Sequence, residues 1–163
     1  MLMRVATVIS SRGTCTRAYV GAVIAIEGRV ISMGYVGAPS GMPHCIEVGD
    51  EIGEDGGCIR TVHAEANAIA WAARNGFGTE EAELFCTHEP CLACAKLIVN
   101  AGITRVVYEH PYRKHDGITL LNDAGIEIFN MPAPEDTFDP SRGGIMVIDD
   151  DDDDNDDHYK RVN

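Results

Sequence analysis

The sequence has no long hydrophobic run. None of its apolar stretches approaches the ~20 residues that a helix needs to cross a bilayer. Residues 1–12 include some apolar side chains but lack the continuous apolar region and the small-residue cleavage site of a secretory signal peptide. These absences predict a soluble protein in the cytoplasm, or in the host cytoplasm if the source is a virus.

Basic residues are also scarce. Lysine and arginine number 13 against 26 aspartates and glutamates, and the formal net charge is -13. Eight of the aspartates lie between positions 149 and 157, and the rest of the chain is mildly acidic with no basic stripe. Because nucleic-acid polymers are bound largely through Lys and Arg contacts to phosphate, this composition argues against a polymer partner.

The length of 163 residues and the 45% hydrophobic content predict one globular domain. We assign the domain to residues 1–148 and a separate acidic tail to residues 149–163. An aspartate run cannot bury enough apolar area to offset the entropy of ordering it, so we expect this tail to be disordered.

The apolar runs of the domain begin with two strand-like runs that form a hairpin, and strand-like and helix-like runs alternate after it. The long stretch at 35–60, rich in glycine, proline and acidic residues, is typical of a functional loop. The alternation predicts an α/β layer structure with one mixed sheet. We expect strands at 20–26, 30–34, 83–87, 105–108 and 126–130, and helices at 63–74, 91–100 and 118–123.

Two short motifs lie at the starts of predicted helices. His63 and Glu65 form an H-x-E, and Cys91 and Cys94 follow Pro90 in a P-C-x-x-C. One imidazole and two thiolates suit tetrahedral Zn²⁺ and leave a fourth position for water, as in catalytic sites. The glutamate would lie beside that water and move its protons.

Each motif alone has simpler interpretations. A C-x-x-C is commonly half of a structural zinc site or a redox pair, and an H-x-E on a helix usually has no function. A Cys₄ site made from Cys91, Cys94 and two upstream cysteines would leave Glu65 and Pro90 without a role. The combination is the signature of the zinc-dependent deaminases.

Several further blocks resemble the deoxycytidylate (dCMP) deaminase family of the cytidine deaminase-like superfamily, over about residues 15–128. The blocks are 20–24, 34–41, 61–69, 89–96 and 101–103. The resemblance implies hydrolysis of dCMP to dUMP and ammonia, and a three-layer α/β/α fold with a five-stranded mixed sheet and helices on both faces. It also implies a homo-oligomer and allosteric control by dCTP and dTTP, with Mg²⁺ accompanying the effector nucleotide.

The family resemblance assigns roles to individual residues. It makes Glu65 the proton carrier and directs the backbone N–H of Ala64 to the pyrimidine carbonyl. The zinc ligands are then His63, Cys91 and Cys94.

The loop at 34–41 resembles the family segment that lines the sugar and the base. Val36 stands where the family has asparagine, which can donate and accept hydrogen bonds with a sugar hydroxyl. A hydrogen bond lost in a buried site costs about 1–3 kcal/mol, so this departure bears on substrate identity. The residues of this loop expected to contact substrate are Val36, Gly37, Pro39 and Ser40.

Tyr112 and Arg113 lie at the position of the family's substrate-side tyrosine. A tyrosine there can stack on the base, and the planar guanidinium of arginine suits a phosphate dianion. The alternative is a solvated Tyr-Arg pair on a surface loop.

A second group of potential ligands lies upstream. Cys15, His44, Cys45 and Cys58 provide one nitrogen and three sulfurs in a glycine-rich region, which suits a second, structural zinc. Buried free thiols, which behave as small hydrophobes, are the alternative.

We weigh three functions. The first is deamination of free dCMP. The second is deamination of another cytosine compound, such as a 5-substituted dCMP, a nucleoside or a free base, or of adenosine in tRNA, which would require basic, aromatic-rich flanks that this chain lacks. The third is an inactive, zinc-stabilised regulatory module in which Val36 has ended substrate binding.

Overall fold

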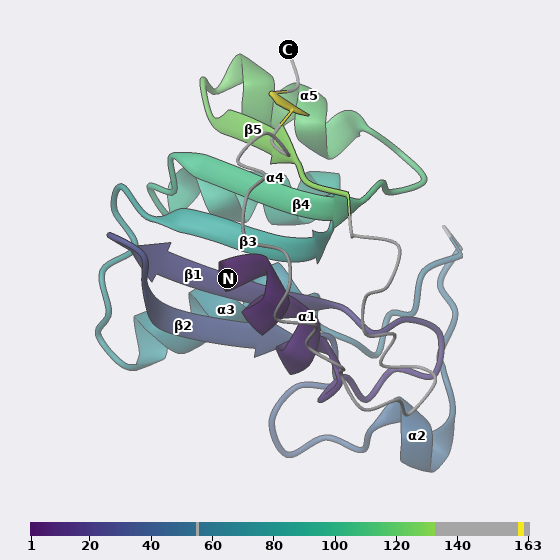
Figure 1. Cartoon of the computed structure of the whole chain (residues 1–163). Coiled ribbons are helices and arrows are strands. Elements are labelled where there is room, and N and C mark those ends of the chain that lie inside the picture. Colours follow the sequence, from purple (N-terminus) through teal and green to yellow (C-terminus); the bar gives the residue numbers. More distant parts are fainter. Residues whose placement is uncertain (55, 133–159, 162–163) are drawn as a thin grey trace, which may run out of the picture.

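The computed structural model describes residues 1–54, 56–132 and 160–161. In these residues, no helix has both the length and the apolar character needed to cross a membrane. The elements follow the predicted alternation (Figure 1). They are α1 (Leu2–Ser10), β1 (Gly21–Ile26), β2 (Arg29–Tyr35), α2 (Cys45–Val48), α3 (Ala64–Arg74), β3 (Glu83–His88), α4 (Leu92–Asn100), β4 (Arg105–His110), α5 (Asp116–Asp123), β5 (Glu127–Asn130) and β6 (Lys160–Arg161).

One mixed sheet runs through the molecule in the order β2-β1-β3-β4-β5-β6. β1 is antiparallel to β2 and β3, whereas β3, β4 and β5 are parallel to one another. Glu27 and Gly28 join β1 to β2, and both have positive φ, as the primed two-residue hairpin turns require. The five predicted strands are confirmed, and the two-residue β6 adds an antiparallel pairing to β5.

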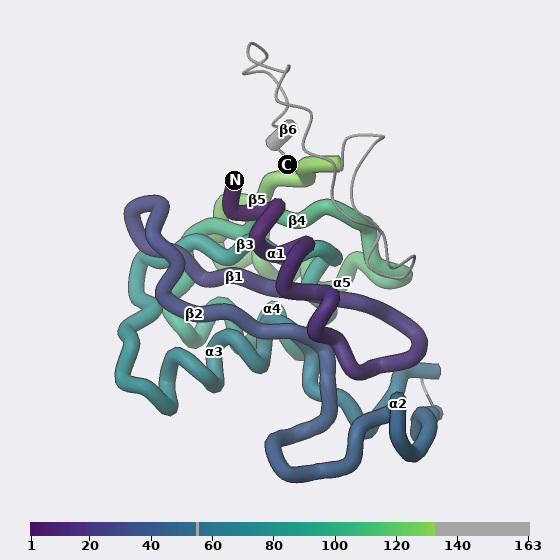
Figure 2. The backbone as a smooth tube through the Cα atoms, turned by 60° about the horizontal axis from the view of Figure 1, so that its bottom comes forward, coloured from purple at the N-terminus to yellow at the C-terminus, as the bar shows by residue number. Residues whose placement is uncertain are grey.

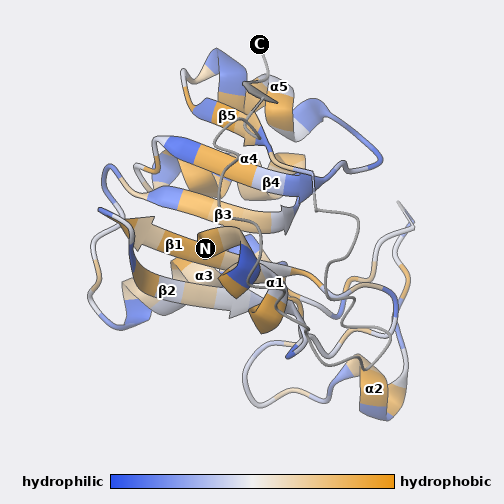
Figure 3. Cartoon of the chain, in the orientation of Figure 1, coloured by the Kyte–Doolittle hydropathy of each residue, from blue (hydrophilic) through white to orange (hydrophobic). Residues whose placement is uncertain are grey.

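Helices cover both faces of the sheet, as predicted (Figure 2). Apolar side chains from alternate strand positions pack on α3, α4 and α5 on one face, and on α1 on the other. β1 is buried along almost its whole length because it is covered from both sides, and its residues are correspondingly hydrophobic (Figure 3). The domain is therefore built as three layers.

Helix α1 is absent from the sequence-based prediction. Its buried residues Met3, Ala6 and Ser10 are spaced three and four apart, which is the helical period. The signal was present but short. Helix α2 was also not predicted and forms one turn within the expected 35–60 loop. The expected tail at 149–163 lies outside the described residues, apart from the two that form β6.

Close packing between β2 and α3 depends on Gly34. A Cβ at this position would overlap the carbonyl oxygen of Ala64 and lie 2.5 Å from the backbone nitrogen of Ala68. The missing side chain lets the first turn of α3 lie directly on the sheet, and this contact places the residues at the start of the helix.

Candidate active site

The predicted metal ligands lie at the starts of two helices. His63 is the N-cap residue of α3, Cys91 is the N-cap residue of α4, and Cys94 lies in the first turn of α4. The His63 Nδ1 atom is 3.4 Å from Cys91 Sγ and 3.5 Å from Cys94 Sγ. Neighbouring β1 and β3 bring the two helices side by side, so residues 28 positions apart in the chain converge.

These distances match a zinc coordination sphere. Zinc bonds of about 2.0–2.1 Å to nitrogen and 2.3 Å to sulfur, at a tetrahedral angle, place the two donor atoms about 3.6 Å apart. The donor atoms of the three residues all lie within 4.8 Å of one another. The donor set and its spacing therefore fit Zn²⁺.

The thiol of Cys91 is strongly acidified. A hydrogen bond from Cys94, with contributions from His63, lowers the pKa of Cys91 to about 3 despite partial burial. The backbone N–H of Cys94, in the first turn of α4, also favours negative charge on this sulfur. A thiolate is the form of cysteine that binds a metal, so this end of α4 is electrostatically prepared for one.

Glu65 lies beside the three donors and is buried, with 3% of its surface exposed. Burial raises the pKa of its carboxyl group, and this effect is opposed in part by His63 and by a hydrogen bond with Cys94. A carboxyl group that holds its proton more tightly than usual is suited to both accept and return one.

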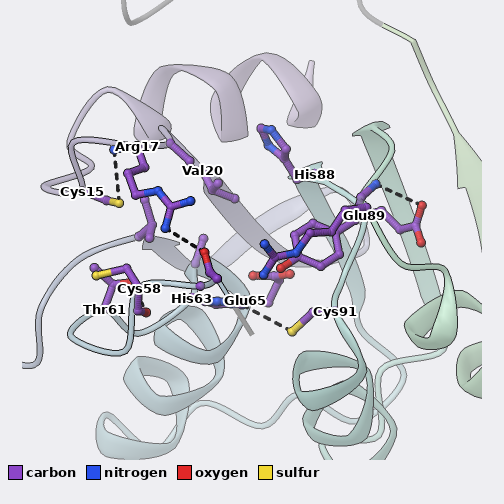
Figure 4. A pocket seen from close by; sticks show the side chains of 17 residues that line it. Cys15, Arg17, Val20, Cys58, Thr61, His63, Glu65, His88, Glu89 and Cys91 are labelled. Carbon is purple, nitrogen blue, oxygen red and sulfur yellow. Dashed lines mark hydrogen bonds between the residues drawn. The ribbon is translucent and has the colours of Figure 1, made fainter. Parts of the chain in front are cut away.

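A cavity of about 270 Å³ opens in front of these residues (Figure 4). Its lining includes His63, Glu65 and Cys91 from the predicted metal centre. Six other predicted site residues also line it, namely Cys15, Val36, Cys58, Ala64, Tyr112 and Arg113. The sheet changes from antiparallel to parallel pairing at β3. The cavity is lined by segments that lie on both sides of this strand, and together they form one site.

Three predicted substrate contacts are not among the lining residues. Gly37, Pro39 and Ser40 lie in the loop after Val36, outside the lining. Gly37 instead forms an antiparallel bridge with Val62, donating to its carbonyl at 3.2 Å and accepting from its N–H at 2.8 Å. That bridge holds the residue before His63, so Gly37 helps to place the candidate metal ligand at the start of α3.

Sequence reasoning missed two charged residues of the lining, Arg17 and Glu89. The Arg17 guanidinium donates to the Gly56 carbonyl oxygen at 2.8 Å, and Glu89 follows directly on β3. A charged residue at the end of a buried strand, next to Pro90, was a signal for Glu89. No local pattern marked Arg17.

The upstream cysteines are partly brought together. Cys45 Sγ and Cys58 Sγ lie 3.7 Å apart, and a carboxylate oxygen of Asp50 completes a group within 4.8 Å. His44 instead contacts Thr14 Oγ1 through its Nδ1 at 3.0 Å, and Cys15 lines the cavity. Asp50 was not predicted.

A family model for the cytidine and deoxycytidylate deaminase zinc-binding region matches residues 1–110. The chain belongs to this family. It is 32% identical to deoxycytidylate deaminase of Enterobacteria phage T4, over 80% of this chain and 88% of that protein. It is 40% identical to ComE operon protein 2 of Bacillus subtilis, over 74% of this chain and 64% of that protein, so it spans less than two thirds of that relative's length.

A solved structure in the family has a similar fold. The crystal structure of dCMP deaminase from the cyanophage S-TIM5, in complex with dCMP and dUMP, superposes with a TM-score of 0.71 and 37% identity. The match covers 79% of this chain and 93% of that one. The predicted family and its fold are confirmed, and zinc is the metal of the family.

Proposed function

We propose that the protein catalyses the hydrolytic deamination of dCMP to dUMP and ammonia. One observation carries the proposal: the metal-donor atoms of two helix starts converge beside a buried glutamate that lines the same cavity. His63, Cys91 and Cys94 would hold Zn²⁺. Zinc, when bound there, supplies a Lewis acid that acidifies water and so provides a nucleophile at neutral pH.

Glu65 would carry the protons of the reaction. Its carboxylate accepts one proton from the attacking water and passes it to N3 of the cytosine ring, then accepts the second proton of the same oxygen and passes it to the amino nitrogen, which leaves as ammonia. Burial keeps bulk water from this carboxylate, so a proton that it takes is retained for the leaving group. The backbone N–H of Ala64, which also lines the cavity, would bind the pyrimidine carbonyl.

Two arginines in the lining support a nucleotide substrate. Arg17 and Arg113 both line the cavity in a chain with a net charge of -13, and the Arg113 guanidinium lies 5.4 Å from the centre of the Tyr112 ring. Planar guanidinium groups bind phosphate in a bidentate manner, through two parallel N–H···O hydrogen bonds. We propose that they bind the 5′-phosphate, with Tyr112 beside the nucleotide.

An assay of ammonia release tests the function. Zinc-loaded protein is incubated with dCMP, 5-methyl-dCMP, CMP, deoxycytidine, cytosine and deoxyadenylate. We expect release from dCMP, abolished by Glu65→Gln and unchanged by Glu80→Gln, an exposed carboxylate outside the lining. Release from another compound in place of dCMP would reassign the substrate, and release from none by the zinc-bound protein would favour the inactive regulatory module.

We also propose a second, structural zinc site at Cys45, Asp50 and Cys58. Asp50 Oδ2 accepts a hydrogen bond from Thr16, while its Oδ1 is buried and meets no oxygen or nitrogen donor among the described residues. Two adjacent sulfurs and such a carboxylate oxygen form a suitable donor set for zinc. The fourth coordination position would be taken by water or by one of the other predicted ligands, His44 and Cys15.

Metal analysis tests the second site. We expect two zinc ions per chain in the wild type, one in Cys45→Ser, and two in Cys86→Ser, which removes a buried thiol outside both clusters. One zinc ion in the wild type would leave Cys45 and Cys58 as free thiols.

Family membership supports three further proposals. We propose a homo-oligomer, action in the cytoplasm, and a rate that responds to dCTP and dTTP, with Mg²⁺ accompanying the effector nucleotide. Light scattering measures the oligomer, and assays with each effector, with and without Mg²⁺, measure the response.

A further inference from the structure

The carboxylate of Glu89 is completely buried, with none of its side chain exposed. A buried carboxylate is costly unless hydrogen-bond donors or a cation surround it. Glu89 Oε2 accepts from the backbone N–H of Tyr112 at 3.3 Å. The Nδ1 atom of His115 lies 2.9 and 3.0 Å from its two oxygens.

Both partners belong to the segment 111–115, which joins β4 to α5. Tyr112 and Arg113 of this segment line the cavity. Glu89 also donates its own backbone N–H to the carbonyl oxygen of His110, the last residue of β4, at 2.8 Å, so its contacts reach the chain before, within and after the cavity-lining pair. Figure 4 draws the bond to Glu89 from the Tyr112 backbone.

The position of Glu89 ties this segment to the metal centre. Glu89 lies two residues before Cys91, and the start of α5 is pressed against the same stretch. A Cβ at Gly117 would overlap the Pro90 carbonyl oxygen and lie 2.9 Å from the Cys91 carbonyl carbon. In Figure 4 the Glu89 carboxylate extends away from His63 and Glu65, so it takes no direct part in chemistry there.

We propose that Glu89, together with His115, is a positioning residue that sets the distance between the nucleotide's phosphate and the metal centre. Its carboxylate holds the Tyr112–Arg113 pair over the cavity while its backbone continues into the metal-binding turn. The inference rests on the proposed function, because it takes Arg113 as a phosphate ligand.

Steady-state kinetics on dCMP and on deoxycytidine, which lacks the phosphate, test the proposal. The variants are Glu89→Gln, which keeps shape but loses charge, and His115→Ala. The His115 side chain is 69% exposed, so its removal opens no cavity in the core, and circular dichroism of each variant checks that the fold is kept when the buried carboxylate loses this partner. Lys114→Ala, in the same segment but outside the lining, is the matched control.

We expect both variants to raise KM for dCMP about tenfold, the loss typical of one hydrogen bond to a charged group, with kcat within twofold. The kinetics of deoxycytidine and of the Lys114→Ala control are expected to stay unchanged. In an Arg113→Ala background, His115→Ala is expected to cause no further loss on dCMP, because both substitutions remove the same interaction.

Equal losses on both substrates, or full additivity with Arg113→Ala, would overturn the positioning role. A failure of the positioning role can be told apart from a failure of the proposed function by equilibrium binding. Binding of dCMP and deoxycytidine is measured in Glu65→Gln protein, with and without His115→Ala. If the wild type turns over no cytosine compound, the function fails. A selective loss of dCMP binding in His115→Ala would still support the positioning role, and its absence would refute it.

Discussion

The residues around the cavity have pKa values that are displaced in opposite directions. The Cys91 thiol is acidified by its hydrogen bond from Cys94, whereas burial raises the pKa of the Glu65 carboxyl. Groups of one site whose pKa values are driven apart commonly divide the roles of charge and proton transfer. Here a thiolate suited to a metal lies beside a carboxyl group suited to carry protons.

Arg17 provides a residue-scale test of substrate binding. Arg17→Ala is expected to raise KM for dCMP about tenfold and leave deoxycytidine unaffected, because it removes a charge-assisted contact to phosphate. Arg12→Ala, an exposed arginine outside the lining, is the control and is expected to match the wild type. Steady-state kinetics on the two substrates measure the effect, and an equal change on both would exclude a phosphate contact.

His88 provides a test by pH. Burial and the neighbouring His110 lower the pKa of His88 from 6.5 to about 4. Between these two pH values the unfolded chain binds a proton at His88 and the folded chain does not. The neutral His88 therefore contributes its full share of stability above pH 6.5, and this share is lost as the pH falls toward 4. Urea unfolding from pH 8 to pH 4.5 is expected to show a steeper loss for the wild type than for His88→Gln. Parallel profiles would contradict the assignment.

At the scale of elements, the starts of α3 and α4 carry the candidate metal ligands. His63 and Cys91 occupy the N-cap positions of α3 and α4, and neither makes a side-chain cap hydrogen bond. Side chains at such positions normally satisfy the first backbone N–H groups. These two are directed to each other instead, with Nδ1 and Sγ 3.4 Å apart.

The contact of β2 with α3 gives a prediction at this scale. Gly34→Ala is expected to lower the free energy of unfolding by about 1–3 kcal/mol, because the new Cβ overlaps the first turn of α3. It is also expected to weaken zinc binding, since it displaces the residues after His63. Gly78→Ala has open space around its Cβ and is the control. Denaturant unfolding and zinc content measure both, and equal stability of the two variants would refute the packing argument.

At the scale of the molecule, one metal ion would join two helices that share few direct contacts with each other. α3 packs mainly on β2 and β1, whereas α4 packs mainly on α5 and makes fewer contacts with α3. Removing zinc with a chelator is expected to abolish deamination and lower Tm by on the order of 5 °C or more, because ligands that bind only the folded state stabilise it. Thermal unfolding before and after zinc is restored measures this effect. An unchanged Tm would mean that the sheet alone holds the helices.

Much of the fold could be predicted because its signals are local. The hairpin at Glu27-Gly28, the helix start after His63 and the proline before Cys91 are each read within a few residues. Helix α1 was missed because nine residues supply few turns for a periodicity to show. The 35–60 loop shows no repeating hydrophobic pattern. The sequence therefore could not indicate that Cys45 lies beside Cys58 and not beside Cys15.

The sequence by itself determined most of the element types, the family and the chemical nature of the donor set, because periodicity, capping and motif spacing act over short distances along the chain. Only the tertiary structure decided which distant residues meet. Arg17 and Glu89 join the cavity, Asp50 joins the two cysteines, and Gly37 leaves the expected substrate wall. These outcomes depend on strand order and loop paths, which bring together residues that no local pattern connects.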